Sequence, residues 1–455
     1  MAIPFRATPS RASESPRWTM GLVVSSDCSR VSAALVSARG CGLNLQAEVA
    51  EGLIVQVPRE TTALWRQWMD AGATSSRAFP RPSEPPARHD RPLPKDLSPA
   101  TDVGEMLAAV GCLRAQLAEV EASAAFALLD EASVPPERIL ALGVCDPGLW
   151  GFAAAPRDSY LGLCDAARLA ESTGMNVIDA FPARDLAAGG QGGPTGALAE
   201  WVLFGHEKLN RVVLDLGRTT RMTFLGAAAA ERGPSRLLSF EVGPGARLID
   251  LLAQRLTNGE QAFDPGGRLA VQGQRLAALL EHWLADPFFR RSIPRWHPRG
   301  VPPDRFLLDA LQMAVQSGWS VRDLLCTATH FVAESIAQAA ARDLPSDAAI
   351  DELVITGGGQ QNGMLLRELS ALFPNVPLRR TTELGVDGDA LGPACAAILA
   401  FFHIDQVPAG LPEVTGCEVA RVLGQLTPGS PQSWQRLLSA IHGARPAVRP
   451  LRSAV

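Results

Sequence analysis

The chain has 455 residues, which is enough for two domains of ordinary size. Hydrophobic residues make up 47% and charged residues 20%, as in soluble globular proteins, and the net charge of -5 gives no electrostatic basis for nucleic-acid binding. The sequence holds no apolar stretch of the roughly 20 residues that a transmembrane helix needs, and residues 1–18 lack the apolar core of a signal peptide. We therefore expect a cytoplasmic protein, without a membrane partner, that begins with a disordered tail.

The first part of the chain predicts an N-terminal α/β domain over residues 19–199. It opens with three short strands joined by tight turns and continues into α/β units. From the hydrophobic patterns we expect strands at 19–25, 30–38, 42–49, 138–145 and 176–179, and helices at 60–70, 103–131 and 160–173. Residues 75–99 are rich in Pro and Arg and cannot bury an apolar face, so they predict an exposed loop.

The second part, residues 200–445, repeats this pattern. We expect strands at 211–216, 221–227, 237–242, 351–356 and 376–380, and helices at 246–257, 271–285, 305–317, 321–343 and 388–402. Residues 287–304 predict an exposed insertion, in which Trp296 anchors the loop or contacts a partner. The last helix and the C-terminal segment are expected to pack back on the N-terminal domain. The repeat predicts two ribonuclease-H-like domains with ligands in the cleft between them.

The turn after the 351–356 strand is the most informative motif. Gly357, Gly358 and Gly359 end the strand, Asn362 follows, and a helical pattern begins at once. Consecutive glycines allow positive φ and a close approach of backbone to ligand, and the free N–H groups of a following helix favour an anion. We expect these four residues to contact a nucleotide; a tight turn without a ligand is the structural alternative.

Further blocks follow in a fixed order, of which the Gly-Gly-Gln-Gly-Gly-Pro run at 189–194 and the Thr-Gly-Gly-Gly-Gln-Gln-Asn run at 356–362 are the most specific. In this order the blocks resemble the anhydro-N-acetylmuramic acid kinases, which belong to the sugar kinase and actin-like ATPase superfamily. The resemblance runs from about Met20 to about Leu437. It implies an actin-like ATPase fold and ATP-dependent phosphorylation, with hydrolysis of the anhydro ring, of 1,6-anhydro-N-acetylmuramic acid or a related amino sugar in peptidoglycan recycling.

The resemblance also implies two turns that hold the phosphates and Mg²⁺. At the first, the family has a glycine-rich turn where this chain has polar side chains, and its candidate nucleotide contacts are Ser25, Ser26, Asp27 and Ser29. The carboxylate in that set is a candidate Mg²⁺ ligand. A hairpin turn without a ligand is an equally good interpretation of this segment.

The second phosphate turn contains Asp215 and Gly217, in an Asp-Leu-Gly-Arg-Thr run that looks like the phosphate turn of the wider superfamily. The resemblance implies that both contact the nucleotide and that Asp215 approaches Mg²⁺. Two residues depart from the family pattern here, since Arg218 stands in place of a glycine and Arg221 in place of an asparagine.

Glu241 occupies the position of the family's general base, which is an aspartate. The carboxyl group is kept but extended by one methylene, and an error of about 1 Å in a catalytic group can cost roughly 10²-fold in rate. Gly243 and Gly245 follow as candidate nucleotide contacts. We expect an ordinary pKa for Glu241, because a carboxylate is already ionised at neutral pH. A solvated carboxylate at a strand end is the alternative interpretation.

The sugar side departs furthest from the family. Arg184 and Asp185 remain, either to bind the substrate or to brace the 189–194 loop as an ion pair, and Gly392 stands where the family has a carboxylate. We expect ATP and Mg²⁺ as cofactors and a homodimer as the assembly. Because several catalytic blocks have changed, the sequence leaves two functions open: a kinase, or a catalytically weak or inactive relative that binds nucleotide or sugar as a sensor. A scaffold acting through residues 75–99 is a third, supported only by composition.

Overall fold

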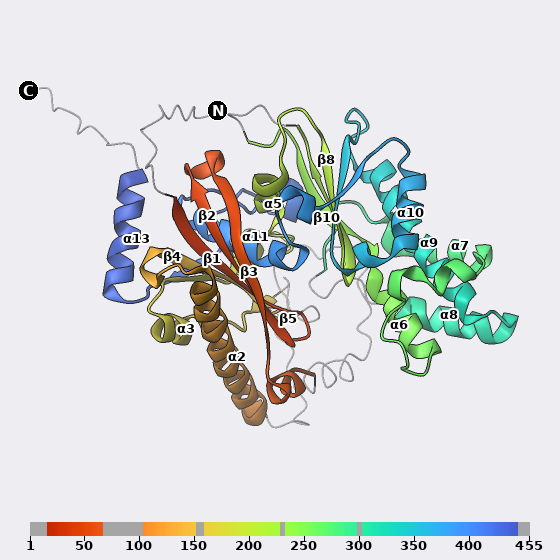
Figure 1. The fold of residues 1–455 in the computed structure, drawn as a ribbon, viewed down its shortest axis with the longest axis horizontal. Helices are drawn as coiled ribbons and strands as arrows, with labels where there is room; N and C mark the ends of the chain where they lie inside the picture. Colours follow the sequence, from red (N-terminus) through yellow and green to blue (C-terminus); the bar gives the residue numbers. More distant parts are fainter. Residues whose placement is uncertain (1–15, 67–102, 152–158, 228–232, 298–302, 445–455) are drawn as a thin grey trace, which may run out of the picture. The chain divides into compact units, whose positions relative to one another are not determined.

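The computed structural model describes residues 16–66, 103–151, 159–227, 233–297 and 303–444. The chain forms two compact units, of which unit 1 comprises Met1–Ala188, Gly392–Ala409 and Arg421–Val455, and unit 2 comprises Gly189–Leu391 and Gly410–Ala420 (Figure 1). The predicted loop at 75–99 and most of the predicted tail at 1–18 lie outside the described residues.

Unit 1 is built on a six-stranded sheet with the order β13-β7-β4-β1-β2-β3. The strands β1, β2 and β3 form an antiparallel meander, β4 and β7 continue parallel to β1, and β13 closes the other edge antiparallel to β7. Their bounds are β1 (Arg17–Val24), β2 (Arg30–Arg39), β3 (Gln46–Gln56), β4 (Ile139–Cys145), β7 (Val177–Asp179) and β13 (Gln425–Thr427).

Helices cover both faces of this sheet. The long helix α2 (Val103–Ala132) packs on one face, where side chains of β1 and β2 share its apolar core. On the other face α11 (Gly388–Ile404) approaches so closely that a Cβ atom on Gly21 would lie 1.7 Å from the carbonyl oxygen of Pro393. The remaining elements of unit 1 are η1 (Gly42–Asn44), η2 (Pro136–Arg138), β5 (Leu149–Gly151), β6 (Ser159–Leu161), α3 (Ala166–Thr173), α4 (Phe181–Ala187) and α13 (Pro431–Ala444).

Unit 2 repeats the arrangement with a five-stranded sheet in the order β10-β9-β8-β11-β12. Here β8, β9 and β10 form the antiparallel meander, and β11 and β12 continue parallel to β8. The bounds are β8 (Arg211–Leu216), β9 (Thr219–Leu225), β10 (Leu237–Pro244), β11 (Glu352–Thr356) and β12 (Leu378–Arg380). The same meander followed by parallel strands occurs in both units, so the predicted α/β fold with two ribonuclease-H-like domains is confirmed.

One face of the second sheet is apolar and the other is polar. Side chains alternate between faces along a strand, and Leu214, Met222 and Phe240 pack into a core with α6 and α9. The residues between them, including Asp215, therefore belong to the opposite face, which α5 contacts over β9 and β10. The elements around the sheet are α5 (Ala197–Phe204), α6 (Ala246–Leu256), η3 (Pro265–Gly267), η4 (Ala270–Gln272), α7 (Ala277–Leu284), η5 (Pro287–Arg290), α8 (Asp304–Ser317), α9 (Val321–Asp343), η6 (Gly358–Gln361), α10 (Gly363–Leu372), η7 (Thr381–Leu384) and α12 (Pro412–Thr415).

Four predicted elements need correction. The helix expected over 160–173 begins only at Ala166, because residues 159–161 form the strand β6. The third strand runs over 46–56 rather than 42–49, because a 3₁₀ turn occupies its expected start. The helix expected over 271–285 is a 3₁₀ turn followed by a shorter helix. The segment after Pro287 is not an exposed insertion, since Phe288 and Phe289 are buried against the core of unit 2. None of the helices within the described segments is long and apolar enough to cross a membrane.

Candidate active site

Four residues of unit 2 form a row across the polar face of its sheet. Thr356 on β11 pairs with Asp215 on β8, Asp215 pairs with Arg221 on β9, and Arg221 pairs with Glu241 on β10. Residues that pair across neighbouring strands project to the same face. The candidate base and the candidate phosphate turn therefore lie in one line, with an arginine between them.

The glycine turn after β11 lies directly against the turn that joins β8 and β9. Gly357 has φ of 79°, and a Cβ atom there would lie 2.7 Å from both Asp215 Oδ1 and the backbone nitrogen of Gly217. Gly359 packs in the same way on Leu216. At both positions a side chain would clash with the β8–β9 turn, and at Gly357 the φ is also one that L-residues rarely adopt.

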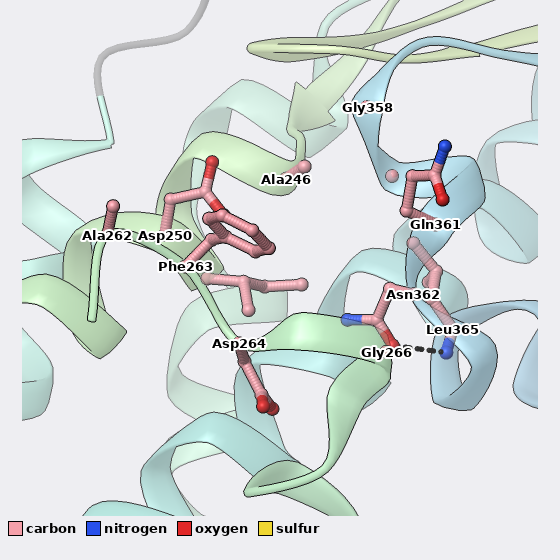
Figure 2. A pocket seen from close by; sticks show the side chains of 12 residues that line it. Ala246, Asp250, Ala262, Phe263, Asp264, Gly266, Gly358, Gln361, Asn362 and Leu365 are labelled. Carbon is pink, nitrogen blue, oxygen red and sulfur yellow. Dashed lines mark hydrogen bonds between the residues drawn. The ribbon is translucent and has the colours of Figure 1, made fainter.

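A cavity of about 320 Å³ opens beside the glycine turn (Figure 2). This volume is within the range of small-molecule sites. A Cβ atom on Gly358 would meet nothing within 4 Å, so this glycine faces the open space. The cavity is lined by Ala246, Ile249, Asp250, Ala262, Phe263, Asp264, Gly266, Gly358, Gly359, Gln361, Asn362 and Leu365.

Two walls of the cavity differ in chemistry. Phe263 and Asp250 lie together on one wall and Gln361 on the other (Figure 2). Phe263 is 53% exposed, which is unusual for a phenylalanine and leaves it accessible to a ligand. Burial raises the pKa of Asp250 to about 6, although Arg247 opposes the shift. The cavity thus offers an aromatic surface, a carboxyl group and a side-chain amide.

The helix after the glycine turn does not begin where the sequence predicted. The 3₁₀ turn η6 comes first, and Asn362 then caps α10 by accepting a hydrogen bond from the backbone N–H of Leu365 at 3.1 Å (Figure 2). The asparagine side chain therefore engages one of the N–H groups that the sequence left free for an anion. Asn362 still lines the cavity.

The other candidate glycines support the turn between β8 and β9. A Cβ atom on Gly245 would lie 2.4 Å from the carbonyl oxygen of Gly217, which also accepts a hydrogen bond from the backbone N–H of Ala246 at 2.9 Å. Gly243 lies under the ring of Phe289. The start of α6, the glycine turn and the β8–β9 turn therefore form one tightly packed backbone cluster at the cavity.

Asp215 has a cation beside it. A guanidinium nitrogen of Arg221 lies 3.6 Å from Asp215 Oδ2 and 2.6 Å from Glu200 Oε1. Burial raises the pKa of Asp215, and Arg221 opposes this shift. Glu200, on α5, is 1% exposed, and its second carboxyl oxygen has no partner among the described residues. Arg221 therefore serves as counter-charge to two carboxyl groups.

Glu241 is not the solvated carboxylate of ordinary pKa that the sequence suggested. It is 5% exposed, and its Oε2 atom is buried without a partner among the described residues. Burial raises the pKa of Glu241 to about 8, although a hydrogen bond from the His297 backbone, Arg221 and Arg295 all oppose the shift. The segment carrying Arg295 and His297 covers β10, and no sequence pattern indicated this cover. Glu241 is thus largely protonated at neutral pH.

The serine turn of unit 1 is internally satisfied. Asp27 Oδ1 accepts hydrogen bonds from the hydroxyls of Ser25 and Ser29, both at 2.7 Å. Partial burial raises the pKa of Asp27, but these hydroxyls outweigh it and hold the pKa below its usual range. The carbonyl of Ser26 accepts from Trp65 at 3.1 Å. The hydroxyls of Ser25 and Ser29, two of the three proposed as phosphate donors, are therefore directed at Asp27.

Arg184 and Asp185, on α4 of unit 1, have different surroundings. Arg184 is exposed, whereas Asp185 is fully buried. Ala180, the N-cap residue just before this helix, has φ of 51°, a left-handed conformation that disfavours alanine. The side chain of Asp185 is therefore withdrawn from solvent, and Arg184 is the more accessible member of this pair.

The profile of the family described as "Anhydro-N-acetylmuramic acid kinase" matches residues 80–429. The chain belongs to this family. The anhydro-N-acetylmuramic acid kinase of Salinibacter ruber is 36% identical over 327 residues, which cover 70% of this chain and 81% of that protein. The enzyme of the same name from Nitrosomonas europaea is 31% identical over 314 residues, covering 69% and 82% of the two chains.

Solved structures give weaker matches. Component A of the (R)-2-hydroxyglutaryl-CoA dehydratase of Acidaminococcus fermentans aligns with a TM-score of 0.39 at 11% identity, over 85% of this chain and 98% of that one. A ROK family glucokinase from Streptomyces griseus, solved with glucose and AMPPNP, aligns with a TM-score of 0.32 at 14% identity, over 84% and 97%. Structural similarity with TM-scores this low does not support any conclusion about the function of this member of the anhydro-N-acetylmuramic acid kinase family.

Sequence reasoning missed Phe263, Asp250 and Glu200. The first two lie in a segment without a motif, and only the folded chain brings them to the glycine turn. Glu200 had one usable signal, because an acidic residue in an otherwise apolar helix indicates a buried partner. The sequence of this anhydro-N-acetylmuramic acid kinase family member does not indicate that the partner of Glu200 is Arg221.

Proposed function

We propose that this chain is an ATP-dependent kinase for 1,6-anhydro-N-acetylmuramic acid or a closely related amino sugar, acting by hydrolysis of the anhydro ring and phosphorylation of the sugar. Membership of the anhydro-N-acetylmuramic acid kinase family supports the reaction class. The observation that carries the proposal is the cavity beside Gly358, which adjoins the backbone cluster around Asp215.

In this proposal the cavity of unit 2 binds the nucleoside. A base stacks on the exposed ring of Phe263, with Gln361 on the opposite wall to hydrogen-bond its edge (Figure 2). Gly358 leaves the backbone open to the ribose or phosphates. The phosphates then extend past Gly357 toward the turn at Asp215 and Gly217, which Gly357 contacts.

Mg²⁺ remains a prediction, and the carboxylates of the two candidate turns are poor fits for a site that the protein builds. Magnesium usually takes one or two protein carboxylates together with phosphate oxygens and water. Asp215 already has the guanidinium of Arg221 at 3.6 Å, and Asp27 is occupied by two hydroxyl donors. Among the described residues, no group of three or more His, Cys, Asp or Glu is arranged to hold a metal. We therefore assign no step to a metal held by the protein.

Glu241 is the proposed general base, acting on the water that opens the anhydro ring. It is placed in line with Asp215 through the register of three strands. With a pKa of about 8, most of the carboxyl group carries a proton at neutral pH and only the minor ionised fraction is able to accept one. Slow turnover at neutral pH follows from this, without loss of the site.

A coupled ADP-release assay with ATP, Mg²⁺ and 1,6-anhydro-N-acetylmuramic acid tests the function. We expect turnover that depends on the sugar and is faster at pH 8.5 than at pH 7. Calorimetric titration of ATP, alone and with the sugar, measures binding independently of turnover. The kinase proposal fails if ATP does not bind, or if it binds while no tested anhydro sugar releases ADP at any pH.

The family resemblance also implies a homodimer. Light scattering on the eluting protein measures the mass directly and compares it with the 48.3 kDa of one chain. A mass near that of a single chain at working concentrations contradicts this part of the proposal and leaves the kinase assignment untouched.

A further inference from the structure

Arg221 is the most unusual residue of the candidate site. The family pattern has an asparagine at this position, so a cation stands where the resemblance leads one to expect a neutral side chain. The register places Arg221 between Asp215 on β8 and Glu241 on β10. Glu200 from α5 and Asp215 both lie within 4 Å of the guanidinium group, and Glu241 is the residue opposite Arg221 on the next strand. Arg221 either only stabilises the fold or also binds the ligand.

The guanidinium is held in place by a buried partner. Glu200 pairs with it at 2.6 Å and is 1% exposed, and Thr223 accepts a hydrogen bond from its other nitrogen at 3.3 Å. A buried carboxylate stays charged only when it is paired. Arg221 thus cannot swing away from the sheet without leaving Glu200 unpaired, so its charge has a fixed position.

The pairing with Asp215 is looser and more open. The distance to Asp215 Oδ2 is 3.6 Å, against 2.6 Å to Glu200, and the side chains of Arg221 and Asp215 are 21% and 35% exposed. An anion arriving at this side can therefore reach the guanidinium group. Arginine presents several N–H donors in a plane and is well suited to bind phosphate oxygens.

The same position lies next to the nucleotide path. Asp215 Oδ1 lies against Gly357, and Gly358 and Gly359 line the cavity. A polyphosphate that leaves the cavity along the glycine turn meets Asp215 first, and two negatively charged groups in contact need a cation between them. A divalent ion is the usual solution, but here the guanidinium of Arg221 already lies beside that carboxylate.

We propose that Arg221, fixed by Glu200, is a phosphate-binding residue whose guanidinium supplies counter-charge that a divalent cation on Asp215 would otherwise provide. The inference rests on the proposed nucleotide site of unit 2. It implies that the chain binds ATP with little dependence on Mg²⁺, and that removing the Arg221–Glu200 pair makes binding dependent on the metal.

The variant is designed so that the fold survives. Arg221→Asn alone would leave Glu200 buried and unpaired, so the test uses the double substitution Arg221→Asn with Glu200→Gln. The matched control is Arg211→Gln with Glu352→Gln. That ion pair, at 2.6 Å, joins β8 to β11 at the opposite end of the same strand. Glu352 also pairs with Arg379 on β12 at 2.6 Å, so the control removes two ion pairs, as the double variant does at Arg221. Thermal unfolding is recorded for all three proteins.

Calorimetric titrations with ATP and with adenosine are made in EDTA and again with excess Mg²⁺. For the wild type we expect ATP affinities that agree within about threefold between the two conditions. For the double variant we expect ATP binding in EDTA to weaken by at least about tenfold, Mg²⁺ to restore most of it, and adenosine binding to stay unchanged. The control pair should match the wild type throughout.

The outcomes separate this inference from the proposed function. Wild type that binds ATP only with Mg²⁺, or a double variant that binds ATP in EDTA as the wild type does, overturns the role of Arg221 and leaves the kinase proposal standing. Wild type that binds neither ATP nor adenosine overturns the nucleotide site, and the inference with it. Equal loss of adenosine and ATP in the double variant shows a structural role only and also overturns it.

Discussion

Glu241 lies directly opposite Arg221 in the antiparallel pair of β10 and β9, and the guanidinium is nevertheless directed to Glu200, at 2.6 Å. The Oε2 atom of Glu241, at the family's base position, is buried without a hydrogen-bond partner among the described residues, and this setting favours the protonated form of the carboxyl group. This relationship sets the pH dependence that we expect of the chain.

The rate of ADP release should rise with pH and reach half of its maximum near pH 8. The reason is that only the ionised carboxylate of Glu241 accepts a proton, and burial raises its pKa to about 8. Glu241→Gln should abolish turnover at all pH values while ATP affinity stays within about threefold. A rate that is flat between pH 6 and pH 9, or activity that survives in Glu241→Gln, removes Glu241 from the mechanism.

The stability of the protein should fall as pH rises, because of the same residue. A carboxyl group whose pKa is raised in the folded state, here from 4.5 to about 8, stabilises the fold fully below the lower value and loses that contribution as pH passes through the higher one. Glu241→Gln should flatten the decline between pH 5 and pH 8 and raise the free energy of unfolding at pH 7 by about 1–3 kcal/mol. Chemical denaturation at several pH values measures this, and an unchanged slope contradicts the burial of the group.

Gly358→Val should weaken ATP binding by at least about tenfold, or roughly 1.4 kcal/mol. A Cβ atom at Gly358 meets no protein atom within 4 Å, so the substitution fills ligand space without disturbing the fold. Gly111→Val, at another open glycine in α2, is the matched control and should leave binding unchanged. Unchanged affinity in a folded Gly358→Val protein shows that the turn is only structural.

Gly357→Ala should lower the free energy of unfolding by at least about 2 kcal/mol. The new Cβ atom would combine a φ of 79° with contacts at 2.7 Å to Asp215 and to the backbone of Gly217. Gly358→Ala, one residue further along, has neither problem and is the natural comparison. Equal stability of the two variants in urea would mean that the glycine turn does not pack on the β8–β9 turn as described.

Phe263→Ala should weaken adenosine binding between about fivefold and a hundredfold, because stacking of a base on an aromatic ring contributes about 1–3 kcal/mol. Phe263 is 53% exposed, so replacing it should lower the free energy of unfolding only slightly. Phe126→Ala removes another partly exposed phenylalanine, on α2, and should leave binding unchanged. Retained adenosine affinity in Phe263→Ala places the base elsewhere.

The sequence predicted the fold well because the fold depends on local patterns. The alternation along Leu214, Asp215 and Leu216, for example, identifies a strand with one apolar and one polar face. The third strand was misplaced because Gly42 and its neighbours form a 3₁₀ turn, and nothing in their composition separates such a turn from a strand end. The boundary of a strand or helix often depends on a single backbone hydrogen bond, and the pattern of side chains in the sequence does not predict such a bond.

The candidate site was predictable only in its backbone. The consecutive glycines predicted a close approach of backbone segments, and Gly357 makes such an approach. The charge state of Glu241, in contrast, depends on burial by residues more than fifty positions away, including Arg295. The role of Arg221 likewise depends on Glu200, which reaches it through the fold. The pKa values depend on burial and ion pairing between residues far apart in the chain. A single sequence does not show which of its residues are buried or paired in this way.

Unit 1 is assembled from three stretches of chain, two of which follow nearly all of unit 2 in the sequence. During synthesis, β7 therefore remains an unpaired edge strand of the first sheet until β13 is made. The surface around Gly21 and Gly143 likewise remains uncovered until α11 is made. A fragment ending at Ala188 would carry that open edge and apolar surface permanently. We expect it to aggregate, so that the two units are not separable by a single cut, and early termination of translation yields an insoluble product rather than half an enzyme.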